Sequence, residues 1–226
     1  MKKYWLLPLL VLSLTVGKGQ IIDPNFKPKL KGLPQIRFMM VLPDDKVILS
    51  GDLSSVDDEA VRRFVRLETD GTLDQEFSEN ISKISKGFSN IYDAVYDKEL
   101  NKIYVAGYFE EYNDLLRLNY DGTIDETFNV SINLINVHDI GVQSSGKIVC
   151  LTESSNGIIR FNIDGTIDET FNNNSGPDSY GTYTSELKIL TNDKIIVGGD
   201  FNSFNGSSFN DMIQLNADGT IDESFN

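Results

Sequence analysis

Cysteine and positive charge are scarce in this chain of 226 residues, and each scarcity excludes a class of protein. The single cysteine, Cys150, permits no intrachain disulfide and no cysteine-rich zinc site. Only 20 Lys and Arg residues stand against 34 Asp and Glu residues, so the formal net charge is −14. Because nucleic acids and anionic membranes are held by clustered Lys and Arg, neither is an expected partner. The 40% of hydrophobic residues is enough for a folded core.

Residues suited to catalysis are equally few. The one histidine, His138, lies in an apparent strand, and no serine stands in a Gly-x-Ser-x-Gly sequence. Cys150 lies between Val149 and Leu151, which predicts a small buried hydrophobic side chain and not a nucleophile. We therefore expect no enzyme and no cofactor. Carboxylate pairs of the glycosidase kind are neither indicated nor excluded among so many acids.

The first 19 residues have the layout of a secretory signal peptide. Lys2 and Lys3 precede a short apolar stretch over residues 4–16, and Gly17 and Gly19 predict cleavage before Gln20. A membrane-spanning helix would need a longer apolar stretch, and no later segment is apolar enough to span a bilayer. We expect a protein that is secreted, periplasmic or attached to the cell surface.

What the chain has in abundance is internal repetition. Residues 66–77 return in similar form at 117–128, 160–171 and 214–225, each with an Asp-Gly dipeptide and a final Phe, and residues 22–26 form a partial copy. A second, Lys-led motif precedes each full copy, at residues 45–51, 101–107, 146–152 and 193–199. Two motifs in the same order four times define repeats of about 43–54 residues.

Each repeat predicts three or four antiparallel strands. An apolar run (36–42, 91–96, 137–142 and 187–190) precedes the β-branched, Lys-led motif, and a third run ends at 67, 118, 161 or 215. The Asp-Gly dipeptide then closes a hairpin, because glycine adopts the positive φ that such a turn requires. The following Asp-x-x-Phe segment is either a short fourth strand or the crossing to the next repeat.

These repeats predict an all-β fold, a β-propeller of four blades. We expect a signal peptide at 1–19, a lead-in at 20–35 and a propeller at 36–226, with units at about 36–78, 79–130, 131–174 and 175–226. The ring either closes with four blades or is an open arc of a larger propeller, and an open arc is expected to self-associate. A sandwich of hairpins is the alternative fold.

The two motifs together resemble the delta-60 repeat, a β-propeller repeat of unknown function in secreted bacterial proteins. The resemblance is clearest at residues 193–201, with Val197, Gly198, Gly199 and Phe201, and covers nearly all of 21–226. The third unit departs most, since Cys150, Leu151 and Thr152 stand where Gly-Gly is usual. The resemblance implies an exported protein but no activity and no binding residues.

Two charged features of the repeat motif could form sites. Residues 119–125 resemble part of a calcium-binding loop, but Arg117 and Phe128 occupy positions where that loop places oxygen ligands, so a turn with Asp125 paired to Arg117 is favoured. Arg66, Arg117 and Arg160 could line a pocket for an anion, but Gln214 in the last repeat favours a paired structural role. We expect no metal site.

The variable loop between the second and third strands is the candidate binding surface. Its aromatic and Asn residues are of the kind that contact sugars or anchor peptides. We expect Phe109 and Phe201 to fill gaps between blades, and Tyr112, Phe204 and Asn205 to be exposed ligand-binding residues. The predicted function is a non-catalytic binding or interaction module for a glycan or an envelope protein. The alternative is a carbohydrate-active hydrolase or lyase with carboxylates at the ring centre.

Overall fold

Four antiparallel sheets follow one another along the chain. The computed structural model describes residues 25–84, 88–109, 114–132, 134, 136–152, 157–172, 176–177 and 186–225. Blade 1 comprises β1 (Leu30–Val41), β2 (Val47–Val56), β3 (Glu59–Ala60) and β4 (Phe64–Leu67), and blade 2 comprises β5 (Phe88–Asp97), β6 (Lys102–Phe109) and β7 (Leu115–Asn119). Blade 3 comprises β8 (Val137–Val142), β9 (Ile148–Thr152) and β10 (Ile158–Phe161), and blade 4 comprises β11 (Glu186–Ile189), β12 (Ile195–Gly198) and β15 (Met212–Leu215). A hairpin of β13 (Ser203–Phe204) and β14 (Ser207–Ser208) stands between β12 and β15.

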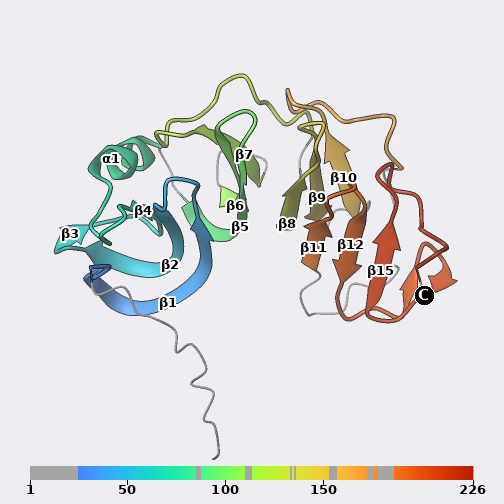
Figure 1. Ribbon diagram of the computed structural model, residues 1–226, viewed down its shortest axis with the longest axis horizontal. Helices are drawn as coiled ribbons and strands as arrows, with labels where there is room; N and C mark the ends of the chain where they lie inside the picture. Colours follow the sequence, from blue (N-terminus) through green and yellow to red (C-terminus); the bar gives the residue numbers. More distant parts are fainter. Residues whose placement is uncertain are drawn as a thin grey trace, which may run out of the picture.

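The blades are arranged as an arc whose inner side is formed by the first strand of each blade. These inner strands contact one another in chain order, β1 with β5, β5 with β8 and β8 with β11. No packing of comparable extent joins β11 back to β1 among the described residues. Figure 1 shows blades 1 and 2 on one side and blades 3 and 4 on the other. The predicted four-repeat β-propeller is confirmed, and its four sheets form an unclosed arc.

The cores lie between blades, because the middle strands bury both of their faces. Along β6, Ile103 and Val105 join the cluster shared with blade 1, whereas Tyr104 and Ala106 join the cluster shared with blade 3. Alternating side chains of a strand point to opposite faces, so one strand contributes to two cores. This double burial explains why the Lys-led motifs are almost continuously apolar. Cys150, completely buried in the cluster between blades 2 and 3, is the small hydrophobic residue that the sequence predicts.

The Asp-Gly turns have the predicted geometry. In each repeat the glycine has φ of +84° to +89°, and the preceding Asp accepts hydrogen bonds from the backbone N–H and the hydroxyl of the following Thr. The segment after the turn forms a single bridge to the third strand, as in Leu118 with Ile124, and then leaves the sheet. The Asp-x-x-Phe segment was predicted to be either a short fourth strand or the crossing to the next repeat, and the structure shows the crossing.

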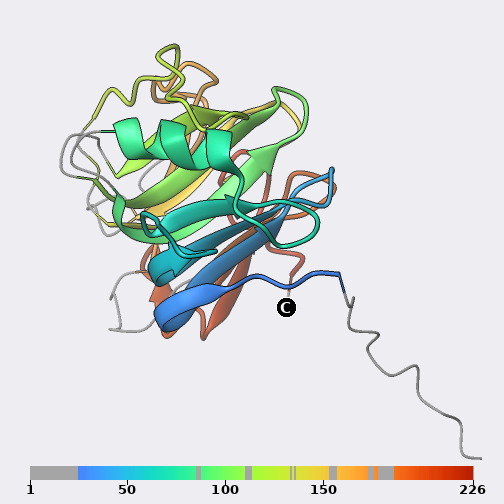
Figure 2. The same cartoon turned by 90° about the vertical axis from the view of Figure 1, so that its left-hand side faces the viewer.

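Repeat 1 differs from the others by a helix that the sequence analysis did not predict. The helix α1 (Gln75–Lys83) begins at Asp74, whose side chain accepts a hydrogen bond from the backbone N–H of Phe77. Phe77 and Ile81 lie one turn apart and are buried in the core between blades 1 and 2. The helix lies alongside these two blades in Figures 1 and 2.

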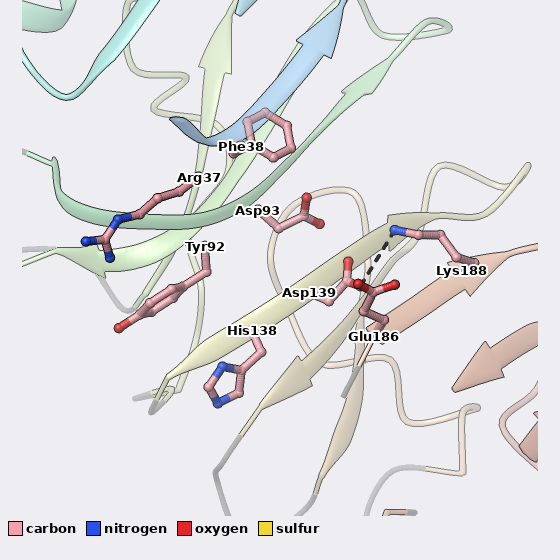
Figure 3. Close-up of a pocket in the computed structure, with 8 residues that line it drawn as sticks. All are labelled: Arg37, Phe38, Tyr92, Asp93, His138, Asp139, Glu186 and Lys188. Carbon is pink, nitrogen blue, oxygen red and sulfur yellow. Dashed lines mark ion pairs between the residues drawn. The ribbon is translucent and has the colours of Figure 1, made fainter. Parts of the chain in front are cut away.

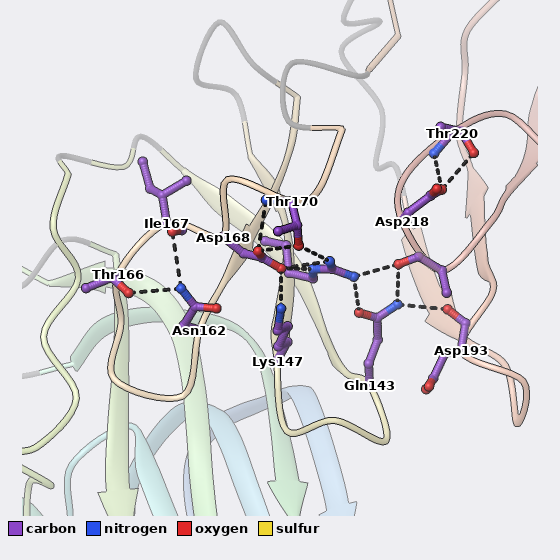
Figure 4. A network of polar contacts seen from close by, with 12 residues as sticks. Gln143, Lys147, Asn162, Thr166, Ile167, Asp168, Thr170, Asp193, Asp218 and Thr220 are labelled. Carbon is purple, nitrogen blue, oxygen red and sulfur yellow. Dashed lines mark hydrogen bonds and ion pairs between the residues drawn. The ribbon is translucent and has the colours of Figure 1, made fainter.

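A buried arginine in each of the first three repeats fastens its blade to the next one. Arg117 pairs with Asp125 at 2.8 Å, and its other end donates to the Ile163 carbonyl of blade 3 at 2.6 Å. Arg66 and Arg160 pair in the same way with Asp74 and Asp168, and donate to the carbonyls of Tyr120 and Ala217. Figure 4 shows the polar contacts around Asp168.

The lead-in completes this pattern in front of blade 1. Between blades 2 and 3 and between blades 3 and 4, the residue after the final Phe donates its backbone N–H to the Asp-Gly turn of the next repeat, Asn129 to Asp164 and Asn172 to Asp218. Lys27, which follows Phe26, donates in the same way to Asp70 at 3.1 Å. The lead-in therefore packs on blade 1 as the end of a preceding repeat would.

Candidate functional site

The inner strands carry three carboxylates and one aromatic ring at equivalent positions. Ser50, Ala106, Leu151 and Gly198 stand at the same place in the four Lys-led motifs, and they pair with Phe38, Asp93, Asp139 and Glu186. A shift of register, the mark of a β-bulge, precedes the first three of these residues. Bulges turn a side chain away from the regular alternation of a strand. The bulges place Phe38, Asp93 and Asp139 on the inner side of the arc, where Glu186 lines the same groove.

The two aspartates reach across to the next blade. The Asp93 carboxylate accepts a hydrogen bond from the backbone N–H of Ile140 at 3.0 Å, and the Asp139 carboxylate accepts one from Leu187 at 2.7 Å. Ile140 and Leu187 are themselves equivalent positions of β8 and β11. Each carboxylate therefore satisfies a backbone donor of the neighbouring inner strand and holds two blades in a fixed relation.

Asp93 and Asp139 also interact with each other. Burial, followed by the hydrogen bond to Asp139 and the charge of that carboxylate, raises the pKa of Asp93 to about 8. The Asp93 carboxyl group therefore keeps its proton to a higher pH than a free aspartate does. Glycosidase carboxyl groups stand about 5 to 9.5 Å apart, with room for substrate or water between them. Two carboxyl groups in hydrogen-bond contact do not form such a pair.

Around these carboxyl groups lies a groove of about 430 Å³ formed by all four inner strands. Figure 3 shows its lining: Arg37, Phe38, Tyr92, Asp93, His138, Asp139, Glu186 and Lys188. Tyr92 is 39% exposed, and its ring centre lies 5.8 Å from that of His138. The Lys188 ammonium lies 3.7 Å from the Asp139 carboxylate. The lining therefore carries two cationic side chains, Arg37 and Lys188, and three carboxyl groups, and the Arg37 guanidinium also pairs with Asp52 at 3.1 Å.

The ligand-binding residues predicted in the variable loops do not form this groove. Tyr112 lies outside the described residues. Phe204 was expected to be exposed, and this is wrong, because the β13–β14 hairpin places its ring in the core between blades 3 and 4 with no exposed surface. Asn205 is exposed, and its backbone and side chain exchange two hydrogen bonds with the backbone of Gly176. The burial expected for Phe109 and Phe201 is confirmed.

The charged groups of the repeat motif have the structural role that the sequence favours. Asp125 accepts hydrogen bonds or ion pairs from Arg117, Lys102 and Thr127, and these contacts hold the pKa of its carboxyl well below the usual range against the opposing effect of burial. The guanidinium group of Arg117 also lies 5.0 Å from the centre of the Phe128 ring. No group of three or more His, Cys, Asp or Glu side chains that could hold a metal ion occurs in the described part of the chain.

Sequence reasoning missed the groove because its residues lie inside apolar runs of different repeats. Asp93 and Asp139 interrupt strands that otherwise read as core, and an isolated acid in such a run was the available signal. His138 was assigned to a strand, which is confirmed, but its place at the groove was not foreseen.

Comparison with known proteins identifies the class of this fold. The chain belongs to the family described as a beta-propeller "Domain of unknown function (DUF5122)", whose model matches residues 42–77, 101–128, 143–171 and 190–225. Among solved structures it is similar to a protein of unknown function from Bacteroides caccae, with 9% sequence identity and a TM-score of 0.44, over 89% of this chain and 68% of that one. No curated protein matches the chain. In the described part of the chain, no helix is long and apolar enough to cross a membrane.

Proposed function

We propose that the protein is a non-catalytic binding module that holds a neutral, hydroxyl-rich ligand, a glycan, in the groove of the inner strands. The observation that carries this proposal is the groove lining, which sets cationic and carboxyl side chains beside the exposed ring of Tyr92. A strongly charged ligand would meet groups of its own charge sign there as well as groups of the opposite sign, whereas sugar hydroxyls can donate to Glu186 and accept from Lys188.

Two further features suit a sugar. The half-exposed ring of Tyr92 offers an apolar face of the kind on which a pyranose ring packs. The exposed Glu186 carboxylate and Lys188 ammonium of β11 offer an acceptor and a donor at the same groove, which suits a hydroxyl group that both donates and accepts. The groove is open, so it suits part of a longer chain better than an enclosed small molecule.

The proposal also covers the cellular location of the protein and the type of its repeats. The signal-like residues 1–19 support export to the periplasm, the cell surface or the medium, where glycans are abundant. The motifs of residues 193–201 support assignment of the repeats to the delta-60 type.

Binding to an array of neutral and charged glycans tests the proposal, followed by calorimetry with the best ligand. Tyr92→Ala should weaken binding at least tenfold, while Tyr108→Ala, which removes a ring that is 49% exposed on β6, should leave it unchanged. Capture of charged glycans only, or equal effects of the two variants, would refute the groove as a neutral-sugar site. If the protein binds an envelope protein and no glycan, the proposal that its ligand is a glycan is refuted.

The alternative function, a carbohydrate-active hydrolase or lyase, has one observation in its favour, since carboxylates do line the inner side of the arc. The contact between Asp93 and Asp139 speaks against that pair, so Glu186 would have to serve as one catalytic carboxyl group. Incubation with glycosidase and lyase substrates tests it. Turnover that Glu186→Gln abolishes would overturn the non-catalytic proposal.

A further inference from the structure

The tip of the β13–β14 hairpin carries a dipeptide that the proposed function does not use. The two strands pair Phe204 with Ser207, so the two residues between them, Asn205 and Gly206, form the turn. Both residues have a positive φ, +50° and +74°, which Asn and Gly adopt more easily than other residues do. Both residues are also exposed. The amide group of Asn205 and the main chain that follows it are therefore accessible to water.

The side chain of Asn205 is held by the segment that precedes blade 4. Its Oδ1 accepts the backbone N–H of Gly176 at 2.9 Å, and its own backbone N–H donates to the Gly176 carbonyl at 3.1 Å. A fixed donor at Oδ1 stabilises the negative charge that develops on this oxygen when a nucleophile adds to the amide carbon, Cγ. This contact therefore favours addition at Cγ of Asn205.

The backbone nitrogen of Gly206 is the nearest nucleophile along the chain. Its addition to Cγ of Asn205 closes a five-membered ring, and a side chain on the following residue would hinder that approach. Gly206 has no side chain, and even an added Cβ would meet nothing within 4 Å. Asn101 has a similar left-handed backbone (φ +54°) and is also exposed, but Lys102 follows it. Asn205 therefore combines an accessible amide with an unhindered neighbour.

We propose that Asn205 is a site of spontaneous deamidation. The Gly206 nitrogen forms a bond to Cγ, the bond from Cγ to Nδ2 breaks, and Nδ2 leaves as ammonia together with the proton of the Gly206 N–H. Water then opens the succinimide ring at one of its two carbonyl groups and yields an aspartate or an isoaspartate. The reaction consumes only water, and each product carries one negative charge that the asparagine lacks.

The isoaspartyl product alters the hairpin. Its main chain runs through Cβ and Cγ of the former Asn205, which adds one main-chain atom before Gly206. A two-residue turn matches the twist of its strands only with its regular geometry, so the pairing of Phe204 with Ser207 should loosen. Phe204 has no exposed surface and lies in the core between blades 3 and 4. Deamidation should therefore destabilise the contact between these blades.

Ageing of the purified full chain tests the site. The folded protein is incubated at mildly alkaline pH, digested and analysed by mass spectrometry for the replacement of NH by O. Conversion at Asn205 should be on the order of tenfold faster than at Asn101, because glycine leaves the following nitrogen unhindered. Labelling by an isoaspartate-specific methyltransferase should increase in parallel. No conversion at Asn205, or conversion no faster than at Asn101, would overturn the proposal.

Two variants separate the chemistry from other changes during ageing. Gly206→Ala keeps the amide and has space for its Cβ, so it should fold and convert more slowly than the wild type. Asn205→Gln keeps a side-chain carbonyl but would have to close a six-membered ring, so it should not convert. The Tm of the aged wild type should fall by several degrees, while that of aged Asn205→Gln should not. Equal conversion in Gly206→Ala and the wild type would overturn the proposed reaction, and an unchanged Tm after full conversion would overturn its effect on the blades.

Discussion

The inter-blade arginine gives the sharpest prediction about stability. Replacing Arg117 by Met removes the pair with Asp125 (2.8 Å) and the hydrogen bond to the Ile163 carbonyl (2.6 Å) but keeps an apolar chain of similar length. Breaking a buried ion pair costs about 3–5 kcal/mol. Lys102, at 3.0 Å from the Asp125 carboxylate, retains part of the compensation. We expect the free energy of unfolding to fall by about 3 kcal/mol.

The fourth repeat supplies the comparison variant. Gln214 stands where the other repeats have Arg, and it donates to Asp222 within its own repeat. Arg117→Gln should therefore keep the contact with Asp125 and lose the one with blade 3, for a smaller loss of about 1–2 kcal/mol.

Urea unfolding at pH 7, followed by circular dichroism, measures these differences. Arg62→Gln, at an exposed position of blade 1, is the control and should change the free energy of unfolding by less than about 0.5 kcal/mol. A loss below about 1 kcal/mol for Arg117→Met would show that the arginine does not fasten the blades.

Three further predictions concern the groove, the lead-in and a turn. The pKa of Asp93 is raised from 3.8 to about 8, so the free energy of unfolding should fall as pH rises from about 4 to 8, by at most about 1.4 kcal/mol per pH unit. Asp93→Asn should flatten this dependence of the free energy of unfolding on pH. An unchanged dependence would contradict the raised pKa. Lys27→Pro, which removes the N–H bonded to Asp70, should lower the free energy of unfolding by about 1 kcal/mol more than Lys27→Ala, and equal losses would show that the lead-in hydrogen bond is dispensable. Gly165→Ala brings a Cβ within 2.5 Å of a backbone carbonyl of blade 2 at a φ of +89°, so it should lower the Tm by several degrees more than Gly206→Ala, which has a similar φ and no neighbour within 4 Å; similar shifts would mean that the close approach is not rigid.

Most of the fold could be predicted from the repeat motif. The Asp-Gly turns, the strand order and the pairing of Arg117 with Asp125 follow from local chemistry that is copied four times, which is why they could be predicted. The helix α1 could not be predicted by copying, because Asp74 stands in the same motif as Asp125 and only the residues after it differ. Its signal was local: an N-cap aspartate followed by Phe77 and Ile81, four residues apart.

The residues of the groove could not be recognised by comparing the repeats in sequence alone. Asp93, Asp139 and Glu186 become equivalent only when the pairing of the inner strands is known, because the turn before Lys102 is one residue longer than the other three. The burial of Phe204 was also missed, because the sequence of a variable loop does not show how that loop folds. A loop that reads as variable in sequence folds back on its own blade through the short β13–β14 hairpin.

The fastening between blades has a consequence for how such a chain can lengthen or shorten. The donor is always a side chain of one repeat, but the acceptor in the next is a main-chain carbonyl, contributed by Tyr120, Ile163 or Ala217. A carbonyl is present whatever the side chain is, so a duplicated or deleted repeat meets its new neighbour with a working acceptor and no matching substitution. The hydrogen bond between neighbouring repeats can therefore form whatever the number of repeats. The residue that supplies the carbonyl can change without loss of this hydrogen bond.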